Sequence, residues 1–181
     1  MKNLPLLLLL LTTQWLFGED PSGEQKSTVD RNFVAKDVSD WAKGATYAKV
    51  FLFDYRKDER FRPLLKDGKL HSGVVPKFTK RLSAEQYEVL TKAVTGKHPE
   101  NGASLCHWPH HGFVFYNAKD EPVSQLDICF LCGTKTFNPA GLSLNWNFKS
   151  LRKLIGDMKL PNFVTEKEWE EFFSSLKVDS K

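Results

Sequence analysis

The sequence predicts an α+β fold, in which a small antiparallel sheet has helices packed on it. Strand-like and helix-like segments do not alternate regularly along the chain, which argues against a parallel α/β sheet. Two strand-like segments, 111–116 and 123–130, are separated by the short polar link NAKDEP, which is typical of an antiparallel hairpin. Two amphipathic segments near the C-terminal end can form helices that cover one face of such a sheet.

The first 18 residues have the pattern of a secretory signal peptide. Basic Lys2 precedes an apolar run over 4–11, and small Gly18 precedes acidic Glu19 and Asp20. The run is shorter than the roughly 20 apolar residues of a membrane span. We therefore expect export to a periplasm or to the outside medium, with cleavage near Gly18 and no membrane span afterwards. An uncleaved N-terminal anchor is the alternative.

The stretch 19–32 has Val29 as its one large apolar residue, and we expect a flexible linker there. The remaining residues, 33–181, have the length of a single α+β domain. The chain has a formal net charge of +4, and its basic residues are spread out. Because nucleic-acid binding needs a clustered basic stripe, we expect no nucleic-acid partner. The sequence names no other partner, and we expect a monomer.

The first half of the domain is predicted to contain a strong and a weak strand. Segment 46–56 is rich in β-branched and aromatic residues, which favours a strand. Segment 57–69 is punctuated by proline and glycine and is predicted to be a loop. Segment 70–81 can hold a second strand, which Pro76 weakens.

Three helices are predicted from apolar residues that recur at helical spacing. They cover 84–95, 147–158 and 166–176. Two of them begin with a capping box, in which the N-cap hydroxyl and a side chain three residues later satisfy each other's backbone N–H groups. These capping boxes pair Ser83 with Gln86 and Thr165 with Glu168.

All three cysteines, and three of the five histidines, lie between residues 106 and 132. If the hairpin loop is centred near Asp120, antiparallel pairing puts Tyr116 near Ser124 and His111 near Cys129. A register slip of one residue would change the faces of the strands but not the ends of the hairpin. The segment that enters the first strand and the segment that leaves the second therefore meet at one end of the hairpin.

That end collects side chains that bind zinc. Cys106 with His110, and Cys129 with Cys132, have the spacings of structural zinc sites built from three cysteines and one histidine. A bound ion would also explain an odd number of cysteines in an oxidising compartment, where cysteines otherwise pair. We therefore predict a non-enzymatic, structural Zn²⁺ site, with His111 as the other candidate histidine.

Two other interpretations of the cysteines remain open. Cys129 and Cys132 can form a disulfide, with or without redox activity, or all three cysteines can be inert buried residues. A thioredoxin-like CxxC opens a helix, whereas the CFLC motif is followed by GTKTFNPAGLSLN, which predicts no helix. A hydrolase using Cys129, His111 and Asp127 has weaker support, since ordinary strand alternation gives the same pattern. An enzyme is thus less favoured than a binding protein.

This stretch resembles a family of small exported bacterial proteins of uncharacterised function. The family core has Cys, two residues, Pro, one residue and His, followed by a hairpin and Cys-Phe-x-Cys. The resemblance covers roughly residues 46–133 and implies His111, rather than His110, as the functional histidine. It implies no activity. The matching residues here are Cys106, Pro109, His111, Cys129, Phe130 and Cys132.

Overall fold

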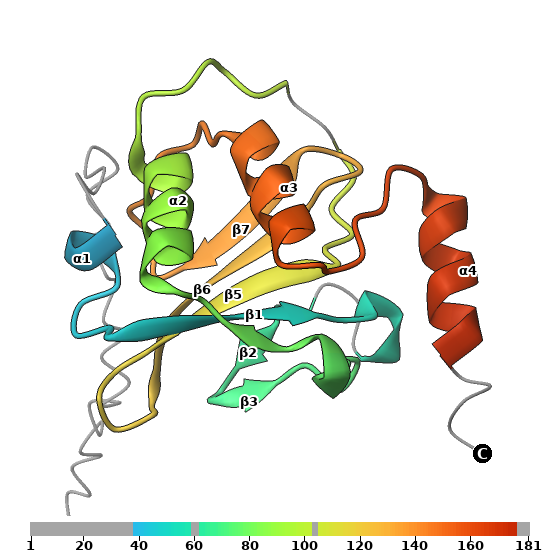
Figure 1. Cartoon of the computed structure of the whole chain (residues 1–181), viewed down its shortest axis with the longest axis horizontal. Coiled ribbons are helices and arrows are strands. Elements are labelled where there is room, and N and C mark those ends of the chain that lie inside the picture. Colours follow the sequence, from blue (N-terminus) through green and yellow to red (C-terminus); the bar gives the residue numbers. More distant parts are fainter. Residues whose placement is uncertain (1–37, 59–61, 103–104, 177–181) are drawn as a thin grey trace, which may run out of the picture.

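The computed structural model describes residues 38–58, 62–102 and 105–176. The predicted signal peptide, the predicted linker and the first residues of the predicted domain lie outside the described residues. The described part forms a five-stranded antiparallel sheet, a separate two-stranded sheet and helices (Figure 1), which confirms the α+β class. None of the helices among the described residues has the length and apolar character needed to cross a membrane.

The larger sheet has the strand order β4-β1-β5-β6-β7. Its centre is the β5–β6 hairpin, and every residue of β5 is buried. This explains why the β5 sequence, HGFVFY, is apolar almost throughout rather than alternating, since both of its faces are covered. The strands are β4 (Lys80–Arg81), β1 (Tyr47–Leu52), β5 (His111–Tyr116), β6 (Pro122–Cys129) and β7 (Thr134–Asn138).

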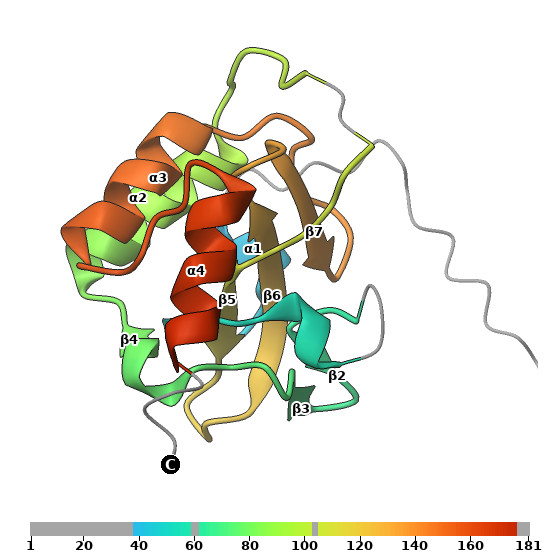
Figure 2. The same cartoon turned by 90° about the vertical axis from the view of Figure 1, so that its right-hand side faces the viewer.

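Helices α2 (Ala84–Thr95) and α3 (Phe148–Asp157) pack side by side on one face of this sheet, as Figures 1 and 2 show. The main hydrophobic core lies between them and the strands. Its sheet residues include Val50, Phe113, Phe115, Leu126 and Ile128, and its helix residues include Leu90, Leu151, Leu154 and Ile155. The short helix α1 (Val38–Trp41) joins this core through Val38 and Trp41.

The opposite face is covered by the chain that follows β1. A 3-10 helix (Tyr55–Lys57) and the two-stranded sheet of β2 (Leu65–Lys66) and β3 (Lys69–Leu70) lie on this side (Figure 2). Leu64 is buried here in a second apolar cluster with Phe53 and Val114. Helix α4 (Glu166–Leu176) covers the end of the sheet, where Trp169 and Phe173 pack with Leu52 and Leu131.

The strand predictions for the first half are partly right. The strand at 46–56 is confirmed over Tyr47–Leu52, and its last residues form the 3-10 helix instead. The predicted loop 57–69 contains β2 and the start of β3, which turn at Asp67 and Gly68 with positive φ. The weak strand at 70–81 is reduced to a single bridge at Val74, a 3-10 helix beginning at Pro76 and the two residues of β4.

The helix predictions are confirmed, and both capping boxes form. Ser83 Oγ accepts a hydrogen bond from Gln86 N while Gln86 Oε1 accepts one from Ser83 N. Thr165 and Glu168 make the same reciprocal pair. The absence of a helix after the CFLC motif is also confirmed, but the segment is a strand, β7, that was not predicted.

The predicted hairpin register is wrong by one residue. His111 pairs with Ile128 and Phe115 with Ser124, and the register shifts between Phe115 and Tyr116. Because side chains alternate between faces along a strand, this slip changes the faces. The side chain of His111 points with Ile128 toward the helices, whereas Cys129 belongs to the other face.

Removing the α2 capping box should weaken the fold measurably. We expect Ser83→Ala to lower the free energy of unfolding by about 1 kcal/mol, because Gln86 N loses its acceptor. Urea unfolding followed by circular dichroism measures this change. Ser174→Ala, at an exposed position inside α4, is the matched control and should leave stability unchanged or slightly raised. Equal losses in both variants would contradict the capping role.

Candidate metal centre

The three cysteines meet at one end of the β5–β6 hairpin. The Sγ atoms of Cys106, Cys129 and Cys132 all lie within 4.8 Å of one another. Cys129 is the last residue of β6 and is buried, whereas Cys106 and Cys132 are half-buried. Antiparallel pairing predicted that the segments carrying these cysteines lie at the same end of the hairpin, and all three cysteines are found there.

The turn between β6 and β7 brings Cys132 into this group. Gly133 has φ +64°, a conformation that favours glycine, and the chain reverses there so that Thr134 pairs with Cys129. The hydroxyl of Thr134 donates a hydrogen bond of 2.9 Å to the carbonyl oxygen of Cys106. It also lies 3.0 Å from Nδ1 of His107. These contacts tie the segment before β5 to the turn after β6.

Cys106 and Cys132 are positioned as a disulfide pair. Their Cα atoms are 6.0 Å apart, within the usual range for disulfides, and Cys129 is left as a free thiol. The expected alternative pairing of Cys129 with Cys132 is therefore not the one in the structure. The reason is the tight turn, which directs Cys132 across to the segment before β5.

The same three sulfur atoms can serve one metal ion. Thiolates bound about 2.3 Å from a tetrahedral zinc lie roughly 3.8 Å apart. In the structure the Sγ atoms of Cys106 and Cys132 are at disulfide distance, so these two atoms would have to separate before all three thiolates could hold an ion. The two states exclude each other, because the sulfurs of a disulfide are no longer thiolates and the thiolate is the form that binds metal.

The structure does not bring the two predicted histidines into the cysteine group. Among the described residues, the group of close ligand atoms contains the three cysteines and no histidine. His111 is on the helix-facing side of β5, where Nε2 lies 2.8 Å from the carbonyl oxygen of Pro161. Its ring packs edge-on against Phe130, with ring centroids 5.3 Å apart. The one-residue register difference accounts for this placement.

His110 lies in an aromatic cluster under α4. Its ring stacks on Trp169 at a centroid distance of 4.5 Å and contacts Tyr55 at 5.5 Å. Both ring nitrogens are buried without a hydrogen-bond partner. Burial lowers the pKa of His110 to about 2, with further lowering by His111 and Arg56. Burial likewise lowers the pKa of His111 to about 4.

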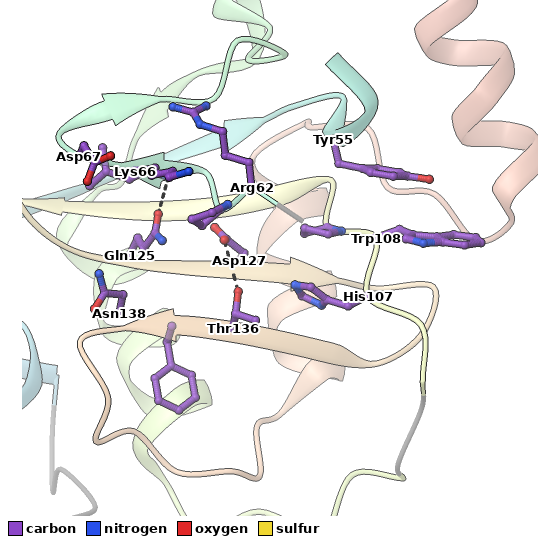
Figure 3. Close-up of a pocket in the computed structure, with 14 residues that line it drawn as sticks. Tyr55, Arg62, Lys66, Asp67, His107, Trp108, Gln125, Asp127, Thr136 and Asn138 are labelled. Carbon is purple, nitrogen blue, oxygen red and sulfur yellow. Dashed lines mark hydrogen bonds between the residues drawn. The ribbon is translucent and has the colours of Figure 1, made fainter. Parts of the chain in front are cut away.

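A cavity of about 500 Å³ lies on the face of β6 and β7 that also carries Cys129 (Figure 3). Polar side chains on neighbouring strands form its floor, where Gln125 pairs with Asn138 and Asp127 with Thr136. Asp127 is 1% exposed, and burial raises its pKa to about 7. The polar positions alternate along TKTFN, a strand pattern that the neighbouring glycine and proline obscured in the sequence.

The buried histidines should make stability fall on acidification. Their pKa values are lower in the folded protein than the ordinary 6.5, so below pH 6.5 the unfolded chain binds protons that the folded chain does not. Each histidine contributes a loss of about 1.4 kcal/mol per pH unit. We expect His110→Phe to reduce the slope of unfolding free energy against pH by this amount between pH 6.5 and 4.5, measured by urea unfolding.

Asp127→Asn provides a control of opposite sign. The folded protein holds a proton on Asp127 up to a pKa of about 7, whereas an ordinary carboxyl loses it near 3.8, so this group favours folding as the pH falls. Removing it should steepen the loss of stability on acidification. Identical slopes for wild type and both variants would show that these groups titrate normally in the folded chain.

Comparisons with protein-family models, with curated proteins and with solved structures find no match for this chain. The resemblance to the exported bacterial family therefore stays a prediction. The geometry of the cysteine group and of the adjoining cavity is the basis for the functions proposed below.

Proposed function

We propose that the chain binds one soft metal ion, most simply Zn²⁺, through Cys106, Cys129 and Cys132, and that the ion has a structural role. The observation that supports this is the approach of all three Sγ atoms to within 4.8 Å. Thiolate ligands favour zinc and copper(I) over hard cations such as Mg²⁺ or Ca²⁺. The ion would clamp three separate backbone segments: the entry to β5, the end of β6 and the turn before β7.

Water fills the fourth position of a tetrahedral ion in this proposal. His110 and His111 are held by aromatic packing and by a backbone carbonyl, respectively. Cys106 and Cys132 are half-buried, so solvent reaches their side of the group. A site with three protein ligands and one water has the composition of many catalytic zinc sites. The proposal stays with a structural role, because an ion held by the three cysteines would join the entry to β5, the end of β6 and the turn before β7.

A thiol–disulfide function is the second candidate, and the disulfide distance between Cys106 and Cys132 favours it. The third thiol, Cys129, is close enough for exchange with that pair after a small movement, and exchange proceeds by thiolate attack on a disulfide sulfur. The proposed setting for either function is outside the cytoplasm, and the signal-peptide pattern of residues 1–18 supports it. A disulfide is the more persistent form in such a compartment.

Metal content distinguishes the two candidates first. Protein purified without added metal or chelator should contain about one zinc per chain by elemental analysis. Cys106→Ser, Cys129→Ser and Cys132→Ser should all lose it, and each should lower the free energy of unfolding by several kcal/mol, because bound zinc contributes to folding. A Cys129→Ser variant that keeps both metal and stability would contradict the metal site.

Thiol counting gives the corresponding expectation for the disulfide. The sequence separation of 26 residues predicts that the Cys106–Cys132 bond adds about 3.5 kcal/mol to stability. Cys106→Ser and Cys132→Ser should lose this amount, whereas Cys129→Ser should keep the bond and most of the stability. In the wild-type protein, unfolded without reduction, a single titratable thiol should be found, that of Cys129. Three titratable thiols in protein from an oxidising compartment would contradict the disulfide.

A further inference from the structure

We propose that the cavity beside the cysteine group binds a small planar aromatic cation of the amidine or guanidine type. In this proposal the ligand ring packs on Trp108, and its N–H edge faces the carboxyl group of Asp127 (Figure 3). The proposal concerns different residues from the metal site and does not depend on it.

The size and walls of the cavity suit a small aromatic ligand. Its volume, about 500 Å³, falls in the range of about 300–1,000 Å³ typical of small-molecule sites. Tyr55 and Trp108 form one wall, with their rings 7° from parallel and their centroids 6.1 Å apart. Leu65 adds apolar surface elsewhere in the lining. Flat aromatic walls favour flat ligands, and they attract cations through their π faces.

The polar floor of the cavity contains a buried carboxyl group with few partners. Oδ2 of Asp127 accepts hydrogen bonds from Leu64 N at 3.2 Å and from the Thr136 hydroxyl at 3.3 Å. Its other oxygen, Oδ1, is buried without any partner. Both partners are neutral and both bonds are long, although a carboxylate can accept about four hydrogen bonds. The group is therefore well suited to accept N–H donors from a ligand.

The cavity reaches this carboxyl group from the side of Thr136. Thr136 is exposed and lines the cavity, and its hydroxyl makes the longer of the two hydrogen bonds to Oδ2. A ligand N–H can replace that hydroxyl at Oδ2 by a rotation of one side chain. The adjacent Gln125 is held in place, since its Oε1 accepts a hydrogen bond from Leu65 N and its amide remains on the cavity lining.

The charges around the cavity favour a cation over an anion at this floor. Arg62 also lines the cavity, but Nη1 lies 2.6 Å from Oδ2 of Asp58, and Nη2 donates to the carbonyl oxygen of Lys69. Its charge is thus compensated. Lys66 and Asp67 are adjacent and exposed at the rim, and their opposite charges leave no net charge there. An amidinium group pairs its two parallel N–H bonds with a carboxylate, as guanidinium does.

Benzamidine is the probe for this site, and benzamide is its neutral control of the same shape. Titration at pH 8, where Asp127 is mostly ionised, is followed by calorimetry and by NMR of the amide and indole N–H signals. It should show benzamidine binding at least about tenfold more tightly than benzamide. A charge-assisted hydrogen bond is roughly twice as strong as a neutral one, and a difference of about 1.4 kcal/mol corresponds to a tenfold difference in affinity. The shifted signals should include the Trp108 indole and the Gln125 side-chain amide.

Two isosteric variants locate the interaction. Asp127→Asn should abolish the preference for benzamidine, whereas Asp67→Asn, at the exposed rim of the same cavity, should change its affinity by less than about twofold, as for a screened surface charge. Equal losses in the two variants would overturn the proposal, since they would indicate a general charge effect. Equal binding of benzamidine and benzamide to the wild type, or no binding of either, would overturn it even if Asp127→Asn did not fold.

Discussion

The antiparallel pairing of β5 with β6 is the interaction on which the rest of the structure depends. Its register sets His111 opposite Ile128 and Gly112 opposite Asp127, and so decides which side chains enter the core and which line the cavity. The helix-facing residues, among them Phe113 and Leu126, form the main core with α2 and α3. A slip of one residue would exchange these sets, placing a carboxyl group in an apolar core at a cost of several kcal/mol.

The same pairing explains why the three cysteines lie together at one end of the hairpin. The chain enters β5 after Cys106 and leaves β6 at Cys129, so pairing alone closes the 23-residue gap between these two. The turn through Gly133 then adds Cys132. Three sulfurs in one small volume have two chemical outcomes, a shared ion or a bond between two of them. The oxidation state of the thiols selects between these outcomes, since metal binding needs thiolates.

Sequence patterns predicted the features that depend on interactions between residues close together in the chain. The capping boxes at Ser83 and Thr165 were visible because each depends on a partner three residues away. Strand β7 was missed because its five residues lie between Gly133 and Pro139 and are stabilised by pairing with β6. The cysteine cluster could be predicted because the antiparallel hairpin brings its two ends together. The location of His110 could not be predicted, because its partner Trp169 lies 59 positions later and only tertiary packing brings α4 to it.

The two edges of the large sheet have a further consequence for how the protein behaves in concentrated solution. One edge, β4, is only two residues long, and both residues are basic, Lys80 and Arg81. The other edge, β7, carries Lys135 and ends next to Pro139, which has no N–H to donate. Short, charged and proline-terminated edges are poor templates for an incoming strand. Growth of the sheet from molecule to molecule, the first step toward fibrils, is therefore discouraged at both sides.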